Sequence, residues 1–203
     1  MGRRKKGDTT TRDKILTTAR KMFSEKGYDA TSVDQIVKAA EINKSSVYYY
    51  FDSKKAILEN IYKEFSDKAL EIKKSFPLGG KISREDIERS IEFNRRNSDV
   101  VKIMWMEMVK SSNETPAFLK YFDQGFIDGK RIADEANVEL EDTRKNRIMV
   151  MFMATFPIWG YTALGEQICS YYKWDKEGFT KDFIDVFYDL YVKNLQNSFG
   201  IEE

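Results

Sequence analysis

Turn-forming residues are scarce in this chain, and this scarcity restricts its possible folds more than any other feature. Eleven glycines and three prolines occur among 203 residues, whereas average usage of the two together is roughly 12%. Folds made of many short strands need tight turns at short intervals, so an all-β fold is disfavoured. Apolar residues recur instead at helical spacing in segment after segment, which predicts an all-α protein.

The absence of histidine excludes much of the chemistry that enzymes use. The sequence has no histidine and one cysteine, Cys169. Without imidazole there is no Ser-His-Asp or Cys-His nucleophile pair and no histidine-bearing zinc site, and one thiol cannot form an intrachain disulfide. The usual hydrolases are thereby excluded, while enzymes built on carboxylates, lysine or a cofactor remain possible. Because the sequence shows neither a catalytic carboxylate pair nor a phosphate-binding loop, we expect no enzyme activity, no cofactor and no bound metal, and the single thiol favours a reducing, cytoplasmic compartment.

Charge is unevenly distributed although the chain as a whole has a formal net charge of +1. Residues 1–60 contain thirteen Lys or Arg and eight Asp or Glu, a net charge of +5, which leaves −4 for the remainder. A basic N-terminal part on an acidic body indicates that the N-terminal part meets a polyanion such as double-stranded DNA. Arg3-Arg4-Lys5-Lys6 is equally well interpreted as an arm on DNA or as a solvated terminus.

Periodicity and capping signals divide the chain into about nine helices. Gly27 ends the first, Thr31 or Ser32 begins the second, and Asn43 and Ser53 begin the third and fourth. Pro77-Leu78-Gly79-Gly80 is the clearest break in the chain. The expected ranges are 11–26, a second helix from 32 or 33 to about 40, 44–50, 54–75, 83–97, 99–111, 116–136, 141–169 and 176–198.

The uncharged stretch from Ile148 to Gly165 is long enough that a membrane span has to be considered. Thr155, Pro157 and Thr162 dilute its apolar character, and no positive-inside asymmetry flanks it. We therefore expect no membrane partner and a helix that is buried on every side. Pro157 should kink this helix and open a place for a pocket wall.

Residues 32–51, SVDQIVKAAEINKSSVYYYF, form two short helices joined by a tight turn, the helix-turn-helix pattern that places its second helix in the major groove. The order of features over residues 11–58, from Phe23-Ser24-Glu25-Lys26-Gly27-Tyr28 to Val47-Tyr48-Tyr49-Tyr50-Phe51, resembles the TetR family of bacterial repressors. Family members usually have glycine in the turn, where this chain has Glu41. A positive φ at Glu41 would cost on the order of 1 kcal/mol.

The resemblance implies a set of DNA contacts in the N-terminal part. Phosphate contacts, which fix register without reading sequence, would come from Thr31, Ser32, Tyr48 and Lys54. Base edges would be met by Lys44, Ser45, Ser46 and Tyr49, and Tyr50 could serve either role. The simplest interpretation of the apolar residues between them is that they form a small core.

The C-terminal part is expected to bind an effector and to dimerise. Large aromatic and methionine side chains fill a core by default, but they also suit a cavity for a flat or aliphatic molecule. The candidate effector-binding residues are Phe93, Met104, Trp105, Met108, Phe122, Phe126, Phe152, Phe156 and Trp159. In the TetR family the last two helices form the dimer interface, which implies burial of Phe183, Phe187, Leu190 and Tyr191 there; packing within one subunit is the alternative.

Together these features predict a helix-turn-helix DNA-binding domain at 1–53 and an effector-binding and dimerisation domain at 54–203, with 54–75 as the linking helix. The predicted function is that of a homodimeric, ligand-responsive transcriptional repressor on a palindromic operator, released by a small, largely apolar effector. The alternative is a helical small-molecule or lipid-binding protein without sequence-specific DNA binding.

Overall fold

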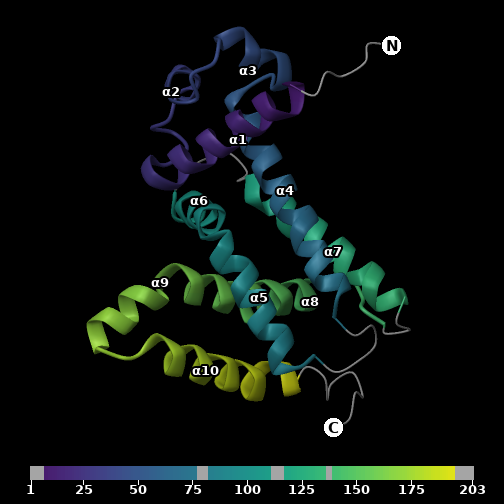
Figure 1. Ribbon diagram of the computed structural model, residues 1–203. Helices are drawn as coiled ribbons and strands as arrows, with labels where there is room; N and C mark the ends of the chain where they lie inside the picture. The colour runs from purple at the N-terminus through teal and green to yellow at the C-terminus, as the bar shows by residue number, and fades with distance from the viewer. Residues whose placement is uncertain (1–6, 77–81, 111–116, 136–138, 195–203) are drawn as a thin grey trace.

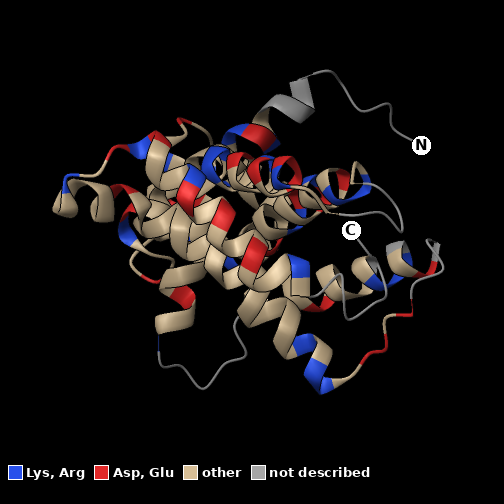
Figure 2. Cartoon of the chain, turned by 90° about the horizontal axis from the view of Figure 1, so that it is seen from below, with Lys and Arg blue, Asp and Glu red and all other residues tan. Residues whose placement is uncertain are grey.

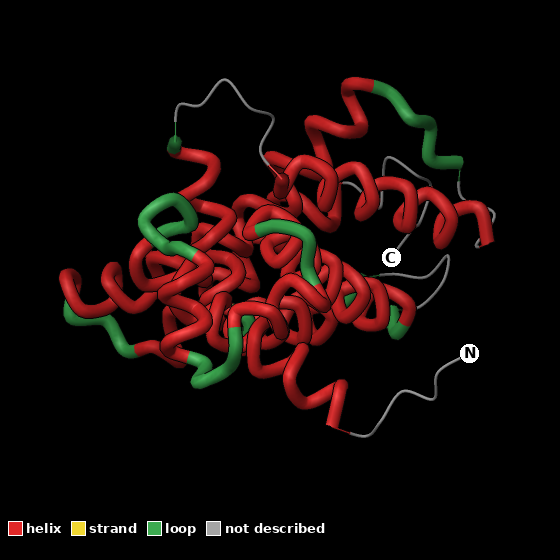
Figure 3. The backbone as a smooth tube through the Cα atoms, turned by 90° about the horizontal axis from the view of Figure 1, so that it is seen from above, coloured by secondary structure: helices red, strands yellow, loops and turns green. Residues whose placement is uncertain are grey.

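The computed structural model describes residues 7–76, 82–110, 117–135 and 139–194. The basic segment Arg3–Lys6 and the break at Pro77–Gly80 lie outside these residues. The described residues form helices and connecting loops without any strand (Figure 3). The prediction of an all-helical chain is confirmed.

Three helices form the N-terminal part, which we call the head: α1 (Gly7–Lys26), α2 (Val33–Ala39) and α3 (Lys44–Tyr50). Their apolar faces meet in a small core whose most buried members are Ile15, Ala19, Phe23, Ile36 and Val47. These residues are the helical stripes of the three segments, so the local pattern determines which face of each short helix turns inward.

The remaining helices form the body, below the head in Figure 1. They are α4 (Lys54–Lys74), α5 (Arg84–Arg96), α6 (Ser98–Val109), α7 (Ala117–Glu135), α8 (Arg144–Ile148), the π-helix η1 (Met149–Thr155), α9 (Phe156–Tyr172), α10 (Lys176–Phe187) and the π-helix η2 (Tyr188–Val192). The segments α8, η1 and α9 follow one another without a break, as do α10 and η2. The described part of the chain therefore holds nine continuous helices, close to the predicted ranges.

Helix α4 runs from the head down along α7 and joins the two parts of the molecule (Figure 1). One hydrophobic cluster extends from Phe23 in the head through Ile57 and Phe65 on α4 to Val101 on α6 and Trp159 on α9. A second, smaller cluster lies where α5 meets the last helix and contains Ile87, Ile184 and Phe187. The head is thus packed on the body through a continuous apolar core.

The long helix Arg144–Tyr172 was predicted to be buried on every side, and the structure shows that it is not. Its residues Trp159, Gly165 and Cys169 are buried, but Phe152 and Leu164 are half exposed. Among the described residues, this is the one helix that is long and apolar enough to cross a membrane. Only 11% of its apolar 18-residue stretch is buried inside the protein. One such helix is weak evidence for a membrane span.

Candidate nucleic-acid interface and internal cavity

The second helix of the head begins and ends with residues that fix its direction. The Ser32 hydroxyl accepts a hydrogen bond from the Gln35 amide, and the Gln35 side chain accepts one from the Ser32 amide. This reciprocal pair is the capping box that the sequence predicted. At the other end Glu41 adopts φ +50°, the left-handed conformation that favours glycine. The turn therefore adopts a conformation that favours glycine although it contains none.

The third helix turns two of its three tyrosines away from the core, whereas Tyr50 packs against it. Val47 is buried beneath it, whereas Tyr48 is 49% exposed and Tyr49 is 73% exposed. The ring of Tyr50 is half-buried and packs edge-on against Tyr49 at 4.9 Å between centroids. Exposed aromatic rings on one face of a helix indicate a surface that awaits a partner.

Polar residues accompany these tyrosines on the same helix. Lys44 and Ser45 are exposed and Ser46 is half-buried. The Lys44 ammonium lies 2.6 Å from the Asp34 carboxylate of α2, and this hydrogen bond raises the pKa of Lys44 above its ordinary value. Both partners are exposed, so the ion pair is weak in water and a base edge or a phosphate can compete with it.

Lys54, the first residue of α4, binds the loop between α1 and α2. Its ammonium donates to the carbonyl oxygens of Tyr28 and Thr31, each at 2.8 Å, and lies over the Tyr28 ring at 4.1 Å from the centroid. Burial lowers the pKa of this ammonium. An ammonium has three donors, so two hydrogen bonds leave one available for a phosphate.

Thr31 is the predicted DNA contact that the structure removes from the surface. Its side chain is fully buried, and its hydroxyl donates to the carbonyl oxygen of Gly27 at 2.9 Å. In this conformation the hydroxyl cannot reach a phosphate. Of the two predicted caps at the start of α2, Ser32 is the exposed one, and Thr31 instead holds the turn after α1.

Two polar contacts fasten the head to the body beside the shared core. The Arg20 guanidinium of α1 forms a bidentate ion pair with Asp99 of α6 and also donates to the Asn97 side chain at 3.2 Å. The Arg12 guanidinium reaches Glu64 and Asn60 of α4 at 2.8 and 2.9 Å. Both α4 and α6 are therefore tied to the head, and a shift of either one would displace it.

The body contains a cavity of about 320 Å³ between α4, α5, η1, α9 and the last helix. This volume is at the small end of the roughly 300–1,000 Å³ of typical ligand sites. Its lining is mostly apolar and consists of Ala69, Ile72, Lys73, Phe76, Ile82, Asp86, Ile87, Ser90, Phe93, Asn94, Tyr121, Val150, Ala154, Thr155, Ile158, Trp159, Phe187, Tyr191 and Val192. The π-helix η1 ends two residues before Pro157 and supplies part of the wall through Val150, Ala154 and Thr155.

The structure brings two of the nine predicted effector-binding residues, Phe93 and Trp159, to this cavity. The other seven do not line it, so the prediction of one shared lining fails for this cavity. They are Met104 and Phe122 in the shared core, Trp105, Met108 and Phe156 packed against that core, Phe126 under the Arg147 guanidinium, and Phe152, which is 50% exposed. Large side chains here fill space rather than border a void.

Three polar residues of the wall were not among the predicted effector-binding residues, although Tyr191 was predicted at the dimer interface. Asp86 is 2% exposed; burial raises its pKa, but hydrogen bonds from Ser83 and Arg89 lower it further, to below its ordinary value. The amide nitrogen of Asn94 donates to the Ser90 carbonyl, while its oxygen is buried without a partner. Burial raises the pKa of the Tyr191 hydroxyl to about 12.

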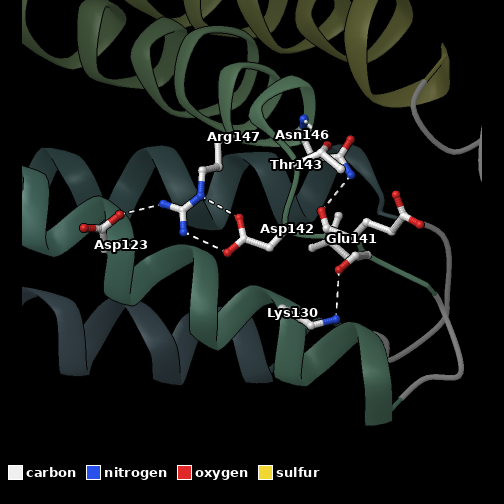
Figure 4. Close-up of polar contacts among 8 residues, drawn as sticks. Asp123, Lys130, Glu141, Asp142, Thr143, Asn146 and Arg147 are labelled. Atoms are coloured by element: carbon white, nitrogen blue, oxygen red, sulfur yellow. Dashed lines mark hydrogen bonds and ion pairs between the residues drawn. The ribbon is translucent and has the colours of Figure 1, made fainter.

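A polar tether holds the cavity wall formed by η1 in place (Figure 4). Arg147, just before η1, reaches Asp123 of α7 at 2.6 Å and the Asp142 carboxylate at 2.6 Å. The Asn146 side chain donates to the Glu141 carbonyl at 2.9 Å. Figure 2 shows basic and acidic residues interspersed along the helices in this way.

The last helix divides the predicted dimer residues between two faces. Phe183, Phe187 and Tyr191 pack within the chain: the Phe183 ring stacks on Tyr161 at 4.5 Å, and the other two line the cavity. These three side chains therefore have partners within the chain, and Phe183 and Tyr191 are only half-buried by them. Leu190 is 73% exposed on the opposite face. The exposed apolar residues of the last two helices include Leu164, Val186 and Leu190.

Comparison with known sequences adds a match that is confined to the head. Residues 15–61 match the family described as "Bacterial regulatory proteins, tetR family". The chain is 54% identical over 52 residues to the Biofilm operon icaADBC HTH-type negative transcriptional regulator IcaR of Staphylococcus aureus strain Newman. That match covers 26% of this chain and 28% of IcaR. The chain thus spans little more than a quarter of the length of the curated relatives it matches.

Solved structures resemble nearly the whole chain. A transcriptional regulator from Aquifex aeolicus VF5 superimposes with a TM-score of 0.59 at 23% identity, over 86% of this chain and 96% of that one. Salmonella enterica GusR superimposes with a TM-score of 0.65 at 18% identity, over 90% of this chain and 95% of GusR. At these identities the likeness shows the fold.

Proposed function

The chain belongs to the TetR family of bacterial regulatory proteins, and we propose that it is a homodimeric transcriptional repressor, located in the cytoplasm, that a small molecule releases from a palindromic operator. In this proposal residues 1–53 bind DNA, and residues 54–203 bind the effector and dimerise, with 54–75 as the linking helix. The observation that carries the proposal is the outward display of Tyr48 and Tyr49 above a buried Val47.

The proposed DNA surface keeps the exposed members of the predicted set. Ser32, Tyr48 and Lys54 hold phosphates, which position the head. Lys44, Ser45, Ser46 and Tyr49 face base edges, and Tyr50 supports Tyr49 through its edge-on ring contact. Thr31 is excluded because its hydroxyl is buried.

A helix of seven residues reads few base pairs, so specificity requires two heads on a two-fold symmetric site. The last two helices expose Leu164, Val186 and Leu190, and these apolar side chains support dimerisation through the two helices. Cavity occupation then selects a conformation in which the heads no longer fit successive major grooves. The Arg20–Asp99 and Arg12–Glu64 ties offer a route by which α4 and α6 move the head.

Selection from a pool of random duplexes tests DNA binding directly. We expect one palindromic sequence to be enriched, with an affinity that falls steeply as salt rises. Tyr49→Ala should weaken binding to that sequence at least about ten-fold. Tyr171→Ala is the matched control because Tyr171 is an equally exposed tyrosine at the far end of α9, and it should leave the affinity unchanged.

Lys54→Ala should reduce the slope of log affinity against log salt by about one unit, since one phosphate contact disappears. The rival function is small-molecule or lipid binding by a helical protein whose head is only a packing element. A pool from which no duplex is enriched would favour that rival.

A further inference from the structure

The cavity wall contains a buried hydrogen-bond acceptor that nothing in the protein uses. Asn94 is 8% exposed and lines the cavity, and its Oδ1 has no hydrogen-bond partner. Its Nδ2 donates to the Ser90 carbonyl at 2.8 Å, which fixes which end of the amide is oxygen. A buried acceptor without a partner costs about 1–3 kcal/mol, so its presence calls for a physical cause.

Three other polar side chains of the wall, those of Asp86, Thr155 and Tyr191, are already engaged in hydrogen bonds within the chain. The Asp86 carboxylate accepts from the Ser83 amide and hydroxyl and is paired with Arg89. The Thr155 hydroxyl donates to the Val150 carbonyl at 3.0 Å, and the Tyr191 hydroxyl donates to the Met149 carbonyl at 3.4 Å. Among the described lining residues, Asn94 thus supplies the fully buried acceptor that an incoming donor satisfies without breaking a bond, and the hydroxyls of Ser90 and Tyr121 belong to the same wall.

The remaining lining describes the body of that molecule. It includes the aromatic rings of Phe93, Tyr121 and Trp159, and Tyr121 and Trp159 are stacked with 5.9 Å between their centroids. Ile72 and Ile87 contribute branched aliphatic surface from α4 and α5. A flat ring with a short alkyl group suits such walls, because ring faces and branched chains both pack well against it.

We propose that the cavity binds a neutral, flat, mostly apolar molecule bearing one hydroxyl or N–H group, whose hydrogen is donated to Asn94 Oδ1. This proposal rests on the cavity's assignment as the effector site in the proposed function. A carboxylate is disfavoured, since it would bring a second anion and no hydrogen towards Asn94 and the buried Asp86. The wall also contains a cation, Lys73, which would favour a carboxylate. Its Nζ already donates a hydrogen bond to the Gly125 carbonyl, at 3.5 Å.

A matched set of three probes tests this proposal by titration calorimetry on the DNA-free protein. The probes are 4-propylphenol, 4-propylanisole and 4-propylbenzoate, which share a body and differ in the polar group. We expect the phenol to bind about ten-fold more tightly than the anisole, the value of about one hydrogen bond to a buried acceptor. We expect the benzoate to bind most weakly. Equal affinity for phenol and anisole, or tightest binding of the benzoate, would overturn the proposal.

Variants of two wall residues then test whether Asn94 causes the preference for the phenol over the anisole. Asn94→Leu is close in size and should abolish or invert the phenol-to-anisole ratio, and Asn94→Ala should do the same if the leucine disturbs the fold. Ser90→Ala changes another polar wall residue and should keep the wild-type ratio. An unchanged ratio in both Asn94 variants would refute the role of Asn94.

Operator release is measured separately on the protein–duplex complex. A phenol that binds through Asn94 without releasing the duplex would uphold this ligand class and remove the regulatory role from the proposed function. Release by the phenol and not by the anisole at equal concentration would support both.

Discussion

The Lys54 ammonium lies 2.8 Å from the carbonyl oxygen of Thr31. This bond joins the first residue of α4 to the last residue before the cap of α2, and so sets the position of the helix-turn-helix on the helix that leads into the body. The same ammonium reaches the Tyr28 carbonyl. Lys54 therefore supports the proposed DNA surface from beneath as well as contributing a charge to it.

Lys54→Met should destabilise the fold by about 1–2 kcal/mol, because two carbonyl oxygens lose a charged donor while the methylene stem is kept. Thermal melting with Lys55→Met as the control measures this, since Lys55 is exposed and adjacent. If the two variants melt together, the bonds to Tyr28 and Thr31 contribute nothing to stability.

Glu41→Gly should stabilise the protein by about 0.5–1 kcal/mol. Glu41 adopts φ +50°, where a side chain is strained and glycine is not, and this relief exceeds the added freedom of glycine in the unfolded chain. Lys38→Gly, in the ordinary helical turn just before, should instead cost about 1 kcal/mol. Chemical denaturation of both variants gives the comparison, and a destabilising Glu41→Gly would contradict the strain argument.

Asp86→Asn should lower stability at neutral pH by about 1–2 kcal/mol and flatten its acid dependence. The folded state holds the pKa of Asp86 below its ordinary value of 3.8, so ionised Asp86 stabilises the fold above pH 3.8. That contribution is lost as the pH falls through the lowered pKa. The two proteins should thus converge in stability at strongly acidic pH. Parallel stability curves over the whole acid range would show that Asp86 is not the group responsible.

The head was predictable from sequence because its order is local. Helix ends are marked by Ser32, Ser53 and Gly27, whose hydrogen bonds reach only three or four residues along the chain. The apolar stripes that contain Ile36 on α2 and Val47 on α3 identify the inward faces of those two helices. The left-handed turn at Glu41 was foreseen as a condition of the resemblance. The burial of Thr31 was not predicted, because the sequence offers the neighbouring hydroxyls of Thr31 and Ser32 equally as N-caps. Only the folded turn shows which of the two caps α2.

The cavity was less predictable because it is defined by what side chains fail to fill. Aromatic and methionine residues such as Met104 and Phe122 fill the space around them and belong to the core. The cavity instead has Ile72, Ile87 and Ile158 among its lining residues. The last helix carries two apolar faces, with Phe187 on one and Leu190 on the other. Periodicity identifies both faces but cannot say which meets the chain's own core.

Leu190→Arg should dissociate the proposed dimer while leaving the fold intact. Leu190 is 73% exposed, so arginine is tolerated in the single chain but leaves an unpaired charge in the interface, which should raise the dimer dissociation constant at least about 100-fold. Analytical ultracentrifugation over a concentration series measures this. Val109→Arg is the matched control because Val109 is an equally exposed apolar residue on α6, and it should remain dimeric.

Phe187→Ala separates the two faces of that helix. Phe187 is buried against Ile184 and Ile91, so its truncation should cost about 3–5 kcal/mol of folding stability without placing a charge in the interface. If Phe187→Ala yielded well-folded monomers and Leu190→Arg stayed dimeric, the faces would be reversed and the cavity would lie against the partner. Since one head reads few base pairs, Leu190→Arg should also lose palindrome preference while keeping its salt-dependent, non-specific binding.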